Sequence, residues 1–491
     1  MQQTKLSELS RKARGKLVSP WVDKLGDILQ LSSWSLERLP EYLWLALIIN
    51  SLGRPAGMQR CIRILKRILA WNPELDSAKL SRYLEQSPKA QDIIYDIISS
   101  EIEPVTLSPL TIAIDYDYSP SFYKHFYTPT CDYETRLETL NHVTRKYYSP
   151  GSNDATDLRF LAIIPQVQSG HIQFLSSLQV TDAVQFYHIT PHTEEIMKIY
   201  RPAIRSLEGI IDNPGTPSSE WVKHYWDVTA QATECELYSI DYKKGETTMD
   251  YKDFIEKTKE AINYLNMQYK KETVSDDAYN VLTGSLIYAF KTFTEVIEHN
   301  LANSLLGRQA ARIIIEVYIM MKYLILHEPD NPAIWSEYMA YGIGKYKLIL
   351  MKLREGKGGN IQHVSEKVLD VLVNEPQSEE FTDIDLRYFD DVKIRDKAIA
   401  VDEKDLYDVA YDYDSDYSHG LWGAIRESCM LTCDNVFHHF RPVADATLSQ
   451  ELPDVTGDCY RIIINLLLLI NERYSFPKWY YEYLGVNHDK I

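Results

Sequence analysis

Four polar side chains recur at every fourth position near the C-terminal end of this 491-residue sequence. They are Tyr407, Tyr411, Ser415 and His419, in the stretch LYDVAYDYDSDYSHG. Residues four apart lie on one face of an α-helix, so the spacing predicts a polar seam along one helix. Aspartates occupy the other faces and would keep those faces in water. We therefore expect the seam to point into a helical bundle, where buried hydroxyl and imidazole groups need partners.

A pair of charged residues in an apolar helix offers those partners. Arg312 and Glu316 stand one turn apart in the stretch AARIIIEVYIMM. An Arg and a Glu buried in such a helix are costly unless they are paired. The sequence therefore predicts hydrogen bonds between this pair and the polar seam. The expected partner in the seam is His419, Ser415 or Tyr411.

Three roles are open to these residues. The first is a hydrogen-bond network, sealed in the core, that fixes the register of the helices. The second is a binding site for a ligand or a nucleic acid, and the third is catalysis. In a catalytic site His419 would be the general acid or base, because the ordinary pKa of imidazole lies nearest neutrality. Arg312 would hold a phosphate or a developing anion, and Glu316 would orient it. The catalytic candidates are His419, Arg312, Glu316, Tyr411 and Ser415.

Four arginines form a second candidate site, for the backbone of a nucleic acid. Arg60, Arg63 and Arg67 share one face of the helix predicted in GMQRCIRILKRILAW, and Arg54 precedes it. Such a face could track phosphates, although a charged stripe is more often a solvated surface. The net charge is -18, but residues 1–100 carry 15 basic and 10 acidic residues, a net of +5. Residues 375–416 carry 5 basic and 15 acidic residues, a net of -10, so only the first region could face an anion.

The cysteines of the sequence, and the motifs that it lacks, exclude several kinds of catalytic and binding site. The six cysteines are sparse and follow no disulfide framework, which indicates reduced thiols in a cytoplasmic protein. In CMLTCDNVFHHF, Cys429 and Cys433 are spaced four apart on a predicted helix, ahead of His438 and His439. A cysteine pair with this spacing can bind zinc. No second cysteine pair lies nearby, however, and cysteine is a common core residue, so we expect these two cysteines to lie in the core. The sequence thus predicts no metal site and no cofactor. Phosphate-binding glycine loops and the common hydrolase, metalloprotease and dinucleotide motifs are also missing from it.

The elements that must position these residues are mainly α-helical. We expect a long-helix bundle in the C-terminal half and an N-terminal helical domain. The predicted regions are a helical region at 1–100, a mixed, mostly helical region at 101–211, and a bundle at 219–491, with a Pro- and Gly-containing linker at 212–219. The apolar runs at 43–49 and 466–470 are too short to span a bilayer and predict buried helices. The basic N-terminus is not followed by the apolar run of a secretory signal.

The order of the motifs resembles a known family. An Arg-x-x-x-Glu pair in an apolar helix precedes the Tyr- and Lys-bearing stretch WSEYMAYGIGKYK, and Tyr-x-x-x-Tyr-x-x-x-Ser-x-x-x-His-Gly follows. This order is similar to the bacterial family DUF5677 over residues 280–440. The resemblance implies an all-α domain in which these polar residues meet, and no established activity. A more distant similarity to the HEPN class, whose ribonucleases use an Arg-x(4–6)-His motif, is incomplete, because the first histidine after Arg312 is His327.

Two functions therefore stay open. One is a bacterial stress or antiviral-defence effector that binds RNA or another nucleic acid, as a metal-independent, HEPN-like ribonuclease. The other is a non-enzymatic helical scaffold whose acidic and tyrosine-rich surface binds a partner protein. A solvent-open cleft at Arg312 and His419 would favour the first, and a sealed core would favour the second. Neither function involves a membrane, and the sequence leaves the oligomeric state open.

Overall fold

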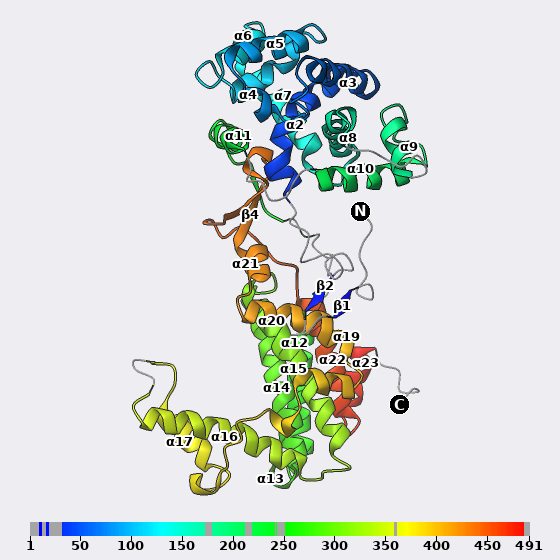
Figure 1. Ribbon diagram of the computed structural model, residues 1–491. Helices are drawn as coiled ribbons and strands as arrows, with labels where there is room; N and C mark the ends of the chain where they lie inside the picture. The colour runs from blue at the N-terminus through cyan, green and yellow to red at the C-terminus, as the bar shows by residue number, and fades with distance from the viewer. Residues whose placement is uncertain are drawn as a thin grey trace. The chain divides into compact units, whose positions relative to one another are not determined.

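In a computed structural model the chain forms two compact units (Figure 1). The structure describes residues 9–11, 16–18, 32–171, 179–211, 219–240, 242, 251–357 and 361–485. The first unit contains Met1–Tyr238 and Thr432–Arg441, and the second contains Ser239–Leu431 and Pro442–Ile491. The predicted linker at 212–219 lies outside the described residues except for Ser219. The division between the units follows Tyr238.

The first unit is built from helices, as the sequence predicts. Its α-helices are α2 (Leu39–Leu52), α3 (Arg54–Trp71), α4 (Leu80–Leu84), α5 (Pro88–Ser99), α6 (Pro120–Phe126), α7 (Tyr133–Tyr148), α8 (Asn153–Gln168), α9 (Gln179–Phe186), α10 (Met197–Ile211) and α11 (Glu220–Gln231). Shorter helical turns are η3 (Trp34–Arg38), η4 (Pro104–Ile112) and η8 (Val436–His438), and the short strands are β1 (Ser10–Arg11), β2 (Leu17–Val18) and β3 (Leu237–Tyr238). Strands β1 and β2 pair with each other in antiparallel fashion.

Helix α2 lies in the core of the first unit. Every residue from Leu39 to Ile49 is buried, because this stretch is almost entirely apolar. The exception is Glu41, whose carboxylate accepts hydrogen bonds from Ser81 and Ser219. The helix packs against α3, α7 and α8. Pro40 occupies its first turn, where the missing N–H has no intrahelical partner to lose. Gly53 ends the helix with a φ of 76°, a conformation that favours glycine.

The second unit is a bundle of longer helices with irregular connections. Its α-helices are α12 (Tyr251–Gln268), α13 (Glu272–Ser275), α14 (Asp277–Glu298), α15 (Leu305–His327), α16 (Ile334–Arg354), α17 (Glu366–Asn374), α18 (Ile394–Ala400), α19 (Lys404–Leu406), α20 (Asp412–Ser418), α21 (Trp422–Cys429), α22 (Thr456–Asn471) and α23 (Lys478–Leu484). Its shorter turns are η5 (Glu379–Phe381), η6 (Phe389–Asp391) and the π-helical turn η7 (Tyr407–Tyr411), and strand β5 spans Pro442–Ala444.

Helices α14, α15 and α22 pack together in the core of the second unit. The break between α14 and α15 lies between Glu298 and Leu305, and Asn300 adopts a φ of 54° there. The turn is tight, because a Cβ on Gly307 would lie 2.4 Å from the carbonyl oxygen of Leu301. Turn η7 and helix α20 pack against α15. This packing puts the polar seam beside the helix that carries Arg312 and Glu316.

The two apolar runs of the sequence lie in helices of these cores. Residues 43–49 belong to α2 and are all buried, and residues 466–470 belong to α22 and are buried or half-buried. Among the described residues, no helix combines the length and the apolar character needed to cross a membrane.

One predicted helix is wrong in part. The helix expected through Cys429 and Cys433 ends at Cys429, and strand β4 spans Met430–Cys433. This strand pairs in antiparallel fashion with β3, with Leu237 opposite Cys433 and Tyr238 opposite Thr432. The partner strand comes from a distant part of the chain, so local sequence carries little sign of the pairing.

Candidate functional site

The polar seam lies on the helical segment formed by η7 and α20, and its partners lie on α15. Ser304 caps the N-terminus of α15 by accepting a hydrogen bond from the backbone N–H of Gly307. Helix α20 ends at Ser418, and His419, the last residue of the seam, is its C-cap. Gly420 follows with a left-handed φ of 59°, a conformation common just after a helix. Both parts of this segment pack against α15.

Arg312 is the centre of the hydrogen-bond network between these elements. Its Nε donates to the hydroxyl of Ser415 over 3.1 Å, and its Nη2 donates to the hydroxyl of Tyr411 over 2.8 Å. The Tyr411 hydroxyl in turn donates to Glu316 over 2.9 Å, and an ion pair of 3.5 Å joins Arg312 to Glu316. The predicted hydrogen bonds between the pair and the seam are therefore confirmed for Tyr411 and Ser415.

The network is only partly buried, so it is not the sealed core that the first of the three roles requires. The side chain of Arg312 is 26% exposed and that of Glu316 is 42% exposed. Tyr411 is the buried member, with 5% of its surface exposed. Burial raises the pKa of the Tyr411 hydroxyl, the charge of Glu316 raises it further, and Arg312 opposes the rise. The phenol therefore keeps its proton near neutral pH and donates it in the bond to Glu316.

An open pocket of about 770 Å³ lies beside this network. Arg312, Glu316, Tyr411 and Ser415 form part of its wall. Its aromatic lining consists of Tyr338, Tyr341, Tyr388, Phe389, Tyr407, Tyr411 and Tyr413. The Tyr407 ring stacks on the Tyr411 ring with 4.8 Å between centroids. The network thus faces a solvent-open space that is rich in aromatic surface.

His419 lies at the edge of the same pocket. It is exposed and caps α20 through its backbone N–H, which donates to the carbonyl of Ser415 over 3.0 Å. The described residues form no hydrogen bond with its imidazole, so its two ring nitrogens face solvent or a ligand. Asp412 and Asp416 are exposed and also line the pocket. The edge of the pocket therefore combines an imidazole with two carboxylates.

Lys397 is a wall residue that the sequence reasoning missed. Its side chain is buried, and its ammonium donates to the carbonyls of Phe389 and Val392, each over 2.6 Å. The ammonium also lies 4.7 Å from the centroid of the Tyr323 ring. Burial lowers the pKa of Lys397, and nearby carboxylates oppose the change. Lys397 therefore holds residues 389–397 in place as a wall of the pocket, and only the fold brings it there.

A second polar cluster, also missed, fixes the far end of α20. Glu427 accepts hydrogen bonds from three tyrosine hydroxyls over 2.6–2.7 Å, those of Tyr242, Tyr413 and Tyr417. Burial raises the pKa of the Glu427 carboxyl, but these three donors outweigh it, and the net change is a lowered pKa. Glu427 thus stays ionised at neutral pH and ties α21 to α20.

Asp414 on α20 faces Arg308 on α15 in a further buried contact. A carboxylate oxygen of Asp414 lies 3.9 Å from the Arg308 guanidinium, which also donates to the carbonyl of Pro453 over 2.6 Å. Burial raises the pKa of Asp414 to about 7, Arg308 opposes this, and Asp458 adds to it. Of the aspartates predicted to face water, Asp414 is therefore an exception, because its carboxylate is buried against α15.

The arginines predicted to bind nucleic acid lie in the first unit. Arg60, Arg63 and Arg67 all form ion pairs with Glu101, at 3.6, 3.4 and 3.0 Å. Three guanidinium groups share this one carboxylate, so the patch keeps a positive charge, and its role in nucleic-acid binding stays a prediction. Arg54 points elsewhere: all three of its nitrogens form hydrogen bonds, to Asp157 and to the carbonyls of two residues in the 187–190 turn.

The fold and the pocket define a mainly α-helical protein with an open polar site in its second unit. A family model described as "Family of unknown function (DUF5677)" matches residues 279–437. This stretch carries Arg312, Glu316 and the polar seam, so the resemblance to that family is confirmed for this part of the chain. No curated protein and no solved structure matches the chain.

Proposed function

We propose that the second unit binds RNA in the pocket beside Arg312 and cleaves it without a metal ion. The observation that carries the proposal is the opening of the network: Arg312, which is 26% exposed, and His419 line one pocket of about 770 Å³ with several aromatic rings. A pocket of this size accommodates a nucleotide or a short segment of single-stranded RNA. The pocket thus offers groups for the phosphate, the bases and the 2′-hydroxyl of such a ligand.

The phosphate would bind to Arg312. Tyr411 and Ser415 hold its Nη2 and Nε on one side, which fixes the plane of the guanidinium. Among the described residues no hydrogen bond uses its Nη1, and the ion pair with Glu316 is the longest of its contacts at 3.5 Å. An incoming phosphate can therefore take Nη1 and compete with Glu316 for Nη2 in a bidentate contact.

The bases would stack on the tyrosines of the wall. Aromatic side chains stack bases of any sequence and contribute about 1–3 kcal/mol for each base. Tyr338, Tyr341 and Tyr388 line the pocket outside the Arg312 network. They are therefore available to a ligand without breaking any contact described for that network.

His419 would supply the proton transfer. In RNA cleavage the 2′-oxygen attacks the adjacent phosphorus, the bond to the 5′-oxygen breaks, and a 2′,3′-cyclic phosphate forms. The imidazole would accept the proton of the 2′-hydroxyl as this bond forms, and a proton from solvent or from the imidazolium would reach the leaving 5′-oxygen. Arg312 would stabilise the charge that develops on the phosphoryl oxygens. The site would take its arginine and its histidine from two helices and so differ from the single Arg-x(4–6)-His motif.

The wider role that fits this proposal is a bacterial stress or antiviral-defence effector in the cytoplasm. The free cysteines of the described residues are consistent with a reducing compartment. The alternative is a helical scaffold that binds a partner protein. An open site with an unpartnered imidazole favours the RNA-cleaving role over the scaffold, because a purely structural network gains nothing from facing solvent.

A cleavage assay on labelled tRNA or total RNA tests the proposal. Wild-type protein is expected to cleave with and without EDTA, and His419→Ala to lower the rate by at least about a hundredfold. Arg312→Lys should also fail, because an ammonium cannot reproduce the bidentate grip of a guanidinium. His299→Ala is the matched control, since His299 is an exposed histidine that caps α14 as His419 caps α20. Its rate should equal that of the wild type.

Two results would contradict the proposal. Equal, background-level cleavage by all four proteins would point to the scaffold. Cleavage that EDTA abolishes and Mg²⁺ restores would reject the metal-free mechanism, and the aspartates of 405–416 would become the candidate metal ligands.

A further inference from the structure

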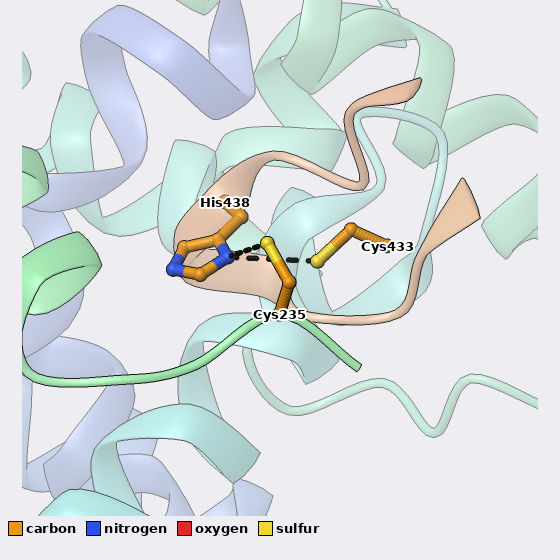
Figure 2. A group of neighbouring side chains, drawn as sticks. All are labelled: Cys235, Cys433 and His438. Carbon is orange, nitrogen blue, oxygen red and sulfur yellow. Dashed lines mark hydrogen bonds between the residues drawn. The ribbon is translucent and has the colours of Figure 1, made fainter. Parts of the chain in front are cut away.

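Three metal-binding side chains converge in the first unit, whereas the pocket residues belong to the second unit. Cys235 follows α11, Cys433 ends β4, and His438 ends η8. Nδ1 of His438 lies 3.0 Å from the Cys235 sulfur and 3.5 Å from the Cys433 sulfur. Figure 2 draws these two contacts as dashed lines. The three ligand atoms lie within 4.8 Å of one another. Cys433 and His438 are buried, and Cys235 is half-buried.

Besides the contacts among the three side chains, hydrogen bonds of the backbone fix the two segments that carry them. Next to Cys235, the carbonyl of Glu236 accepts a hydrogen bond of 2.7 Å from the N–H of Asp434. Asn435 donates from its side chain to the carbonyl of Glu234 over 2.9 Å. The Cys433 N–H donates to the carbonyl of Arg441 over 3.1 Å, which closes the loop that carries His438. The segment 432–441 is thus fixed against the chain at 234–238 by its main chain.

The hydrogen bonds of His438 leave Nδ1 as a lone-pair donor. Its Nε2 lies 3.1 Å from the carbonyl of Ala230 and 3.4 Å from the hydroxyl of Thr233. A carbonyl oxygen can only accept, so Nε2 carries the proton in this assignment, and Nδ1 faces the two sulfurs without one. A backbone carbonyl on the far nitrogen is the usual outer contact of a histidine that binds a metal.

The spacing suits a small tetrahedral ion. Zinc binds thiolate sulfur at about 2.3 Å and imidazole nitrogen at about 2.0–2.1 Å, which separates neighbouring ligand atoms by about 3.6–3.8 Å in a tetrahedron. The distance from Nδ1 to the Cys433 sulfur already matches this edge, and the Cys235 sulfur would need to move by about half an ångström. Arg441 donates from Nη2 to the Cys235 sulfur over 3.9 Å, which places a positive charge beside the cluster.

We propose that Cys235, Cys433 and His438 bind one zinc ion, with a water molecule as the fourth ligand. The described residues contribute three ligands to the cluster, and a solvent ligand would complete the tetrahedron. Zinc bound there would tie the segment 432–441 to the end of α11 and so stabilise the first unit. This inference departs from the sequence-based prediction of no metal site, and it does not rest on the RNA-binding proposal.

Zinc content of the full-length protein tests this assignment. Protein purified without chelator and washed free of loose metal is expected to contain about one zinc per chain by elemental analysis. Cys235→Ser and Cys433→Ser should lower the content at least about tenfold. Cys429→Ser is the matched control, because this exposed cysteine lies four residues before Cys433 and outside the cluster, and it should keep the zinc.

Reconstitution with Co²⁺ covers the case in which a cysteine variant fails to fold. Metal-free wild-type protein, checked by circular dichroism, is expected to take up Co²⁺ with the intense visible bands of a tetrahedral site and a sulfur-to-cobalt charge-transfer band. Three results would overturn the proposal: uptake of no metal by the folded wild-type protein, equal loss of zinc in Cys429→Ser, or a disulfide between Cys235 and Cys433 in freshly purified, unreduced protein.

Discussion

Arg312 has more partners than a surface arginine and more exposure than a core one. Ser415, Tyr411 and Glu316 contact it from two elements, yet a quarter of its side chain remains accessible. A guanidinium that is held by partners on one side and open to solvent on the other can meet a ligand in a fixed orientation. A network that served only to align helices would be expected to bury the arginine completely.

The first prediction at this scale concerns Glu316. Glu316→Ala is expected to lower the free energy of unfolding by about 1 kcal/mol, because Arg312 keeps its bonds to Ser415 and Tyr411 and its solvent contact. A fully buried pair would lose about 3–5 kcal/mol on the same change. Urea denaturation measures the difference. Glu260→Ala, at an exposed position of α12, serves as the control and should change stability by less than about 0.5 kcal/mol. A loss of about 3 kcal/mol or more would show that the network is a sealed structural one.

At the scale of elements, the seam shows what the sequence could predict. Tyr411 and Ser415 share a face as their spacing requires, and the Ser415 hydroxyl donates to the Tyr411 carbonyl over 2.7 Å. The π-helical turn at Tyr407–Tyr411 left no sign in the spacing, because it depends on packing against α15. Gly420 ends the helix at once after His419, so this imidazole lies at the exposed end of the seam instead of inside the bundle.

Other parts of the site could not be predicted because distant segments build them. Lys397 lines the pocket because its ammonium donates hydrogen bonds to two carbonyls of the 389–392 turn. Cys235 precedes His438 by 203 positions, and the pairing of β3 with β4 brings it to the cluster. Motif spacing works within one helix, whereas these contacts depend on tertiary packing.

The prediction for α20 concerns Asp414. Its pKa in the folded protein, about 7, lies above the ordinary value of 3.8, so the folded state binds this proton more tightly than the unfolded state does. This proton stabilises the folded state fully at pH values below the ordinary pKa of 3.8. The stabilisation is lost as the pH rises through the pKa of Asp414 in the folded protein, about 7. We therefore expect the melting temperature of the wild type to fall between about pH 4 and about pH 7, and Asp414→Asn to flatten that fall.

Asp416→Asn is the control for this measurement, because Asp416 is exposed on the same helix. It should leave the pH dependence of the wild type unchanged. If Asp414→Asn shows the same fall in melting temperature as the wild type, burial of Asp414 against α15 is not the cause of the pH dependence.

At the scale of the whole molecule, charge decides how RNA could bind. The net charge of -18 repels a polyanion at long range. Two regions could still meet a phosphate: the arginine patch of Arg60, Arg63 and Arg67 in the first unit, and the pocket in the second. The patch would act through charge alone, whereas the pocket adds stacking and a fixed guanidinium. We therefore expect short-range contacts in the pocket to provide most of the affinity.

Photo-cross-linking locates the bound RNA and tests this central claim most directly. A short single-stranded RNA with 4-thiouridine is irradiated with the full-length protein, and the modified peptides are identified by mass spectrometry. We predict cross-links to the pocket tyrosines at 338–341, 388 and 407–411, and their loss in Arg312→Ala. Cross-links confined to residues 54–67, or pocket cross-links that survive unchanged in Arg312→Ala, would contradict the account.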